Sequence, residues 1–106
     1  MPSTHQKPLK PSSLRIASMD VPVLYEDHSD SEEIVLGQFS SVPSPFITIH
    51  PGLTGRQRPL TMFHEALHAL SSFYGLELDE RAVRTLEHGI VGLLRDNPAL
   101  CRGLIE

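Results

Sequence analysis

The run His64-Glu65-Ala66-Leu67-His68 combines residue types that can bind a divalent metal ion and activate water. Two histidines four residues apart lie on one face of a helix, so both imidazoles can reach the same ion. The glutamate that follows the first histidine can then take a proton from a water molecule at that ion. This spacing predicts a zinc site with His64 and His68 as ligands and Glu65 as the general base.

A catalytic zinc site also needs a third protein ligand and an open position for water. If two helices pack antiparallel about a junction between Tyr74 and Asp79, the carboxylate at the level of the two histidines is that of Glu87. Glu87 also lies on the apolar stripe of its helix, where an unpaired carboxylate is costly. We therefore predict Glu87 as the third ligand, with an ion pair to Arg84 as the alternative reason for a carboxylate there.

Three further side chains of the second helix are secondary candidates. Glu80 shares the apolar stripe but lies about 10 Å nearer the turn, which makes it the alternative third ligand. His88 points about 100° away from the stripe and could stabilise a developing oxyanion. Asp96 could orient a ligand histidine by accepting a hydrogen bond from its ring.

The residues around the motif predict the helix that carries it. Pro59 suits the first turn of a helix, and Gly75 favours a C-terminal stop. Between them, apolar residues recur at helical spacing along one face, namely Phe63, Ala66, Leu67, Leu70 and Phe73. The two histidines and Glu65 fall outside this apolar arc, so we expect them to line the wall of a cleft.

A second helix is predicted after a short loop over residues 75–78. Asp79 can cap its N-terminus, and Asn97-Pro98 ends it. Its apolar stripe consists of Val83, Leu86, Ile90, Leu93 and Leu94. The two helices together predict an αα-hairpin.

The first half of the chain shows strand patterns instead of helical periodicity. These patterns occupy residues 14–25, 34–39 and 46–50, and an acidic stretch over residues 26–31 reads as a solvated loop. We therefore predict an α+β fold, with a short antiparallel three-stranded sheet followed by the αα-hairpin. A peptide substrate could add to this sheet as a further strand along residues 46–50.

Length and composition limit the remaining choices. The chain has 106 residues, which is enough for one domain, expected over residues 14–106 after a flexible, proline-rich arm over residues 1–13. Its formal charge is −4, so we expect neither nucleic acid nor an anionic membrane surface as a partner. A single cysteine and the absence of a long apolar run favour a cytoplasmic location.

The pattern His64-Glu65-x-x-His68, with Glu87 nineteen residues beyond His68, resembles the gluzincin arrangement of zinc metallopeptidases. Residues 14–98 are similar to minimal gluzincins and to ImmA/IrrE-like metallopeptidase domains, which phages and mobile elements often encode. The resemblance implies a zinc ion, a short sheet over the active-site helix, and hydrolysis of a protein or peptide substrate.

Two functions from different classes are compatible with these residues. The first is a zinc-dependent endopeptidase in which Glu65 activates water. The second is a non-catalytic zinc-binding regulatory or interaction protein that keeps the ligands without efficient turnover. A helix-turn-helix DNA reader is disfavoured, because acidic residues are interleaved with the arginines of the second helix.

Overall fold

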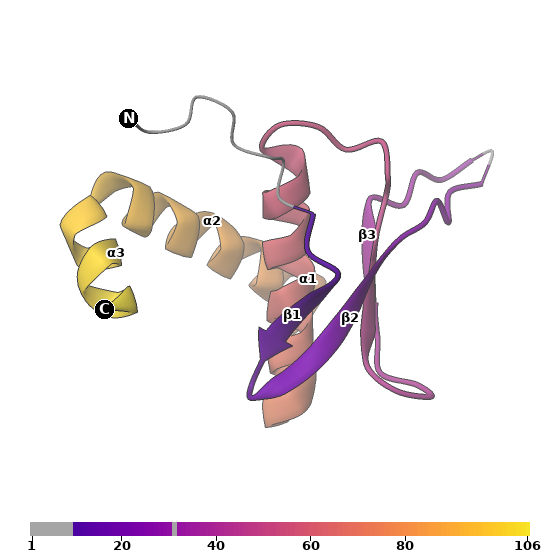
Figure 1. The fold of residues 1–106 in the computed structure, drawn as a ribbon, viewed down its shortest axis with the longest axis horizontal. Helices are drawn as coiled ribbons and strands as arrows, with labels where there is room; N and C mark the ends of the chain where they lie inside the picture. Colours follow the sequence, from indigo (N-terminus) through magenta and orange to yellow (C-terminus); the bar gives the residue numbers. More distant parts are fainter. Residues whose placement is uncertain (1–9, 31) are drawn as a thin grey trace.

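Figure 1 shows the fold of the chain as a computed structural model, which describes residues 10–30 and 32–106. Four strands precede three helices, in the order β1 (Ser13–Ile16), β2 (Met19–Tyr25), β3 (Gly37–Ser40), β4 (Phe46–Ile49), α1 (Gln57–Tyr74), α2 (Glu80–Asp96) and α3 (Pro98–Ile105). The predicted α+β class is confirmed, as is the αα-hairpin, which α1 and α2 form. Of the predicted arm over residues 1–13, the first nine residues lie outside the described part.

The sheet is mixed, with the strand order β1-β2-β4-β3. Strands β2 and β4 run parallel, whereas the β1–β2 and β3–β4 pairs are antiparallel. The predicted three-stranded antiparallel sheet is therefore wrong in the number of strands and in one pairing. The stretch over residues 14–25 divides into two strands because Ala17 and Ser18 adopt φ angles of 50° and 66°, which make a two-residue hairpin turn.

Helix α1 packs against one face of the sheet and closes the core between them (Figure 1). The buried cluster consists of Ile16, Val21, Val23, Ile47, Ile49, Leu53, Met62 and Ala69. Four of these side chains come from β2 and β4, the two central strands, so the core fixes α1 relative to the middle of the sheet. The helix that carries the histidines therefore packs on the buried core.

Helix α2 is held differently, because it leads away from α1 at a steep angle instead of lying beside it (Figure 1). Among its residues only Val83 is buried, and Leu86 and Leu93 are exposed. The chain breaks at Asn97 as predicted, but it continues into α3, a helix that begins at Pro98 and that the sequence pattern did not predict. Among the described residues, no helix is long and apolar enough to cross a membrane.

Candidate metal centre

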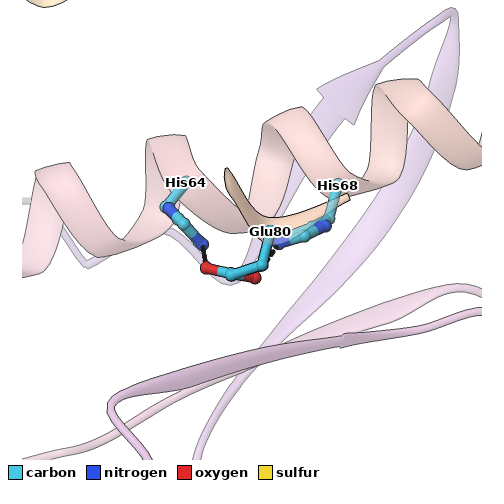
Figure 2. Close-up of side chains that lie close together, drawn as sticks. All are labelled: His64, His68 and Glu80. Carbon is cyan, nitrogen blue, oxygen red and sulfur yellow. Dashed lines mark hydrogen bonds and ion pairs between the residues drawn. The ribbon is translucent and has the colours of Figure 1, made fainter. Parts of the chain in front are cut away.

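The side chains of His64 and His68 converge on the carboxylate of Glu80 (Figure 2). The Nε2 atom of His64 lies 2.6 Å from Oε1 of Glu80, and Nε2 of His68 lies 2.8 Å from Oε2 of the same residue. One ligand atom from each of the three residues lies within 4.8 Å of the other two. Two successive turns of α1 and the first turn of α2 therefore supply a group that could hold a metal ion.

The loop between the helices brings Glu80 to this place. Gly75 ends α1 in the left-handed conformation, with φ at 65°, and reverses the chain. The N–H groups of Leu76 and Leu78 then donate to the carbonyl and the hydroxyl oxygen of Ser71, at 2.9 and 2.8 Å. Because these bonds run the loop back along α1, α2 begins beside the histidines and not at the end of α1.

The start of α2 suits a carboxylate. Asp79 caps the helix, because its side chain accepts the N–H of Ala82 at 2.8 Å, as the sequence predicts. Glu80 follows as the first helical residue, where the helix dipole favours a negative charge. Desolvation acts to raise the pKa of Glu80, but hydrogen bonds and charge from His68 and His64 outweigh it, so this pKa is lowered.

The structure does not bring Glu87, the predicted third ligand, into this group. Its Oε1 atom lies 3.2 Å from Nδ1 of His64, the ring nitrogen that faces away from Glu80. The prediction rested on an antiparallel hairpin without a loop that returns along α1. It therefore placed the residue of α2 that faces the histidines about two turns too far along the helix. Arg84, the alternative partner of Glu87, instead lies 3.7 Å from Glu80.

Glu65 lies beside the two histidines but faces the sheet. The residue is only 7% exposed, and it still lines the cleft, as the helical pattern predicted. Desolvation raises the pKa of its carboxyl group, and the charges of His64 and His68 and the backbone N–H of Phe39 act against this rise. Glu65 is thus a buried carboxylate with raised proton affinity next to His64 and His68.

A cleft runs over these residues in two halves. The Glu77 hollow, of about 690 Å³, is lined by Gly37, Gln38, Phe39, Ser71, Ser72, Gly75, Glu77 and Leu78, together with His64, Glu65, His68 and Glu80. The Arg84 hollow, of about 490 Å³, is lined by Glu33, Ile34, Val35, Leu36, Leu60, Thr61, Arg84 and Glu87, and shares Gly37, His64, Glu65 and Glu80 with the first. His64, Glu65 and Glu80 therefore lie where the two hollows meet, and His68 lines the Glu77 hollow only.

Edge strand β3 forms the wall opposite α1, and its closeness to the helix depends on Gly37. A Cβ atom at this position would lie 2.6 Å from Cγ2 of Thr61 and 3.3 Å from Oε2 of Glu65. Only a glycine lets the strand approach Glu65 this closely. Gly37 was not among the predicted site residues, although a glycine inside the strand pattern over residues 34–39 signals a close backbone contact.

The two remaining predicted site residues lie outside both hollows. His88 is exposed and lines a separate depression with Arg56 and Arg95. Asp96 is 71% exposed at the far end of α2 and lies 3.5 Å from Nε of Arg95. The hydrogen-bonding role considered for Asp96 falls to Glu87 in this structure, since Glu87 contacts the second ring nitrogen of His64.

The donor set fits a zinc ion. Two imidazoles and one carboxylate match a known ligand set of catalytic zinc sites, which leaves a fourth position for water or substrate. The Nδ1 contact of His64 to a carboxylate is the arrangement that orients metal-binding histidines. A His64 ring protonated on Nδ1 donates to Glu87 and leaves the lone pair of Nε2, which faces Glu80, for a metal ion.

Comparison of the chain with models of known protein families, with curated proteins and with solved structures gives no match. Function therefore has to be inferred from the geometry and chemistry of the site.

Proposed function

We propose that the protein is a zinc-dependent peptidase in which His64, His68 and Glu80 hold the metal and Glu65 is the general base. The observation that carries this proposal is the position of Glu65. It is a buried carboxylate between the metal residues and an edge strand, in the cleft where both hollows meet. A purely structural metal site needs a closed ligand set and has no use for an additional buried carboxylate beside it.

The residues divide the chemistry as follows. Zinc, when bound, polarises the scissile carbonyl and lowers the pKa of its water toward about 7. Glu65 accepts the proton of that water at its carboxylate and delivers it to the leaving amine. The raised pKa of Glu65 favours the first transfer, because a stronger base takes the proton more readily. Glu87 holds the ring of His64 in the orientation that directs Nε2 to the metal.

Strand β3 offers the backbone groups to bind an extended peptide. The predicted substrate position along residues 46–50 is excluded, because β4 is flanked by β2 and β3. The N–H of His50 donates to the carbonyl of Leu36, so alternate residues of β3 pair with β4 while Gly37 and Phe39 face the open edge, where the N–H of Phe39 already donates to Glu65. A peptide added at this edge would pass over Glu65.

Substitution Glu65→Gln tests the proposal. It keeps the size of the side chain and its capacity to accept the Phe39 N–H, but it removes the base. We expect the zinc content to remain at one per chain, while the rate of peptide cleavage falls by about 100-fold or more. The measurement compares zinc content and cleavage of an unfolded protein substrate for the wild type, Glu65→Gln and the exposed control Glu32→Gln. Undiminished cleavage by Glu65→Gln would refute the proposal.

One observation favours a second function, that of a zinc-binding protein without turnover. Among the described residues lining the two hollows, no tyrosine and no histidine other than the two metal residues is available to stabilise an oxyanion. Arg84 is the only lysine or arginine of these lining residues, and it lies next to Glu80. Stoichiometric zinc in a wild-type protein that cleaves no substrate would identify this second function.

A further inference from the structure

We infer that the Glu77 hollow is a binding site for a basic side chain, so that the substrate is a peptide with lysine or arginine beside the bond that is cut. This inference rests on the proposed peptidase function and adds the class of substrate to it. The hollow adjoins the metal residues directly, since His64, Glu65, His68 and Glu80 form its inner wall. A side chain bound in it would therefore belong to a residue close to the metal.

The chemistry of the hollow selects a cation. Beyond the metal residues and Glu65, Glu77 is the only charged side chain among its described lining residues, and no lysine or arginine lines it. The remaining lining residues are small, polar or apolar. Phe39 and Leu78 offer apolar surface for the methylene stem of a long side chain, and Gln38 and Ser72 offer further hydrogen-bond acceptors. The volume of about 690 Å³ lies within the range of ligand-binding pockets.

The backbone holds Glu77 in its place in the wall. Its φ angle is 55°, a left-handed conformation that is uncommon for a residue other than glycine. The neighbours on both sides are bound to one residue of α1, because the N–H groups of Leu76 and Leu78 both donate to Ser71. The carboxylate of Glu77 makes no ion pair with another described residue, so it remains available to a ligand.

The other half of the cleft has a different character. The Arg84 hollow combines the guanidinium of Arg84 with the carboxylates of Glu33 and Glu87 and with apolar side chains from residues 34–36. It therefore shows no preference for one sign of charge. The preference for a basic residue should consequently apply on one side of the cleaved bond only.

Cleavage of a peptide library derived from unfolded proteins tests the inference. We expect the zinc-loaded wild type to select lysine or arginine at one position next to the cut. In a matched pair of peptides, replacing that arginine by citrulline, its neutral isostere, should lower kcat/KM by at least about tenfold. Glu77→Gln should remove this difference, and Glu77→Lys should shift the selected residue to aspartate or glutamate. Equal kcat/KM for the two peptides, or an unchanged profile in Glu77→Lys, would overturn the inference.

Two controls separate this inference from the proposed function and from misfolding. Glu32→Lys makes the same charge change at an exposed residue outside both hollows. It should leave unchanged the preference for lysine or arginine next to the cleaved bond. If the zinc-loaded wild type cleaves nothing, the peptidase proposal fails. A binding experiment then tests whether the Glu77 hollow binds a basic side chain. Acetyl-arginine amide should then shift the NMR signals of the amides of Ser72 and Glu77, while acetyl-citrulline amide should not. Equal effects of the two compounds, or no effect of either, would overturn the inference.

Discussion

Both ring nitrogens of His64 contact a carboxylate, and the two carboxylates differ in their other contacts. Glu80 faces Nε2 and shares its carboxylate with His68, whereas Glu87 contacts Nδ1 only. A ligand lost from a metal site removes a metal bond. A lost hydrogen-bond partner of a ligand only loosens the ligand's orientation, which costs about 10- to 100-fold in metal affinity.

This difference predicts a ranking of two substitutions. Glu80→Ala should weaken zinc binding by more than about 100-fold, and Glu87→Ala by about 10- to 100-fold. Competition with a chelator of known affinity measures both values, and the absorption spectrum of bound cobalt reports the number of ligands. Glu32→Ala serves as the matched control at an exposed position. A larger loss in Glu87→Ala than in Glu80→Ala would reverse the assignment of the third ligand.

At the scale of the elements, the contact between β3 and α1 fixes Glu65, the proposed general base. Gly37→Ala should destabilise the fold by about 1–3 kcal/mol, because the added methyl group overlaps the side chain of Thr61 and reaches Glu65. Urea unfolding measures the loss, and peptide cleavage should fall with it as Glu65 is displaced.

The double variant Gly37→Ala/Thr61→Ser provides the control for this prediction. Removing Cγ2 of Thr61 relieves the shortest contact, so most of the lost stability should return. A Gly37→Ala protein as stable as the wild type would show that β3 does not lie this close to α1.

The loop before β3 contains a turn that depends on pH. Asp30 accepts the N–H groups of Glu32 and Glu33 at 2.9 and 2.8 Å, and these bonds lower the pKa of its carboxyl group from the ordinary value of 3.8. The stabilisation of the turn is therefore complete above pH 3.8 and is lost as the pH falls through the lowered pKa.

NMR measurement of the amide signals of Glu32 and Glu33 tests this dependence. The signals should move together as the pH falls below 3.8, and Asp30→Asn, which keeps an acceptor oxygen, should not show the transition. A midpoint above 3.8 in the wild type would contradict the stated hydrogen bonding.

At the scale of the whole molecule, local patterns predicted α1, α2 and the strand-forming stretches, but neither α3 nor the arrangement of the elements. Gly75 and Asp79 mark helix ends through bonds to their own neighbours, so the limits of α1 and α2 could be read from the sequence. The strand order could not, because short apolar runs do not specify their partners. The place of β4 between β2 and β3 leaves it no free edge for the further strand that was predicted along residues 46–50.

The same contrast applies to the candidate site. The proximity of His64, Glu65 and His68 follows from their spacing within one helix. The carboxylate that meets the histidines depends on how the loop over residues 75–79 returns along α1, and this path rests on the hydroxyl group of Ser71. Counting residues from the helix junction does not reveal such a hydrogen bond. For this reason Glu87, and not Glu80, was predicted as the third ligand.

A bound metal ion would also have a consequence for the molecule as a whole, because it would link two helices that differ in how deeply they are buried. Helix α1 belongs to the main core, while α2 buries a single residue and leads away from it (Figure 1). An ion held by His64, His68 and Glu80 links the two helices at the point where α2 begins.

The most direct test is a crystal structure of the zinc-loaded protein with anomalous data collected at the zinc absorption edge. One peak is expected per chain, about 2.0–2.2 Å from Nε2 of His64, from Nε2 of His68 and from a carboxylate oxygen of Glu80. A zinc-loaded crystal without a peak between these three residues, or with the peak bound by Glu87 in place of Glu80, would contradict this assignment.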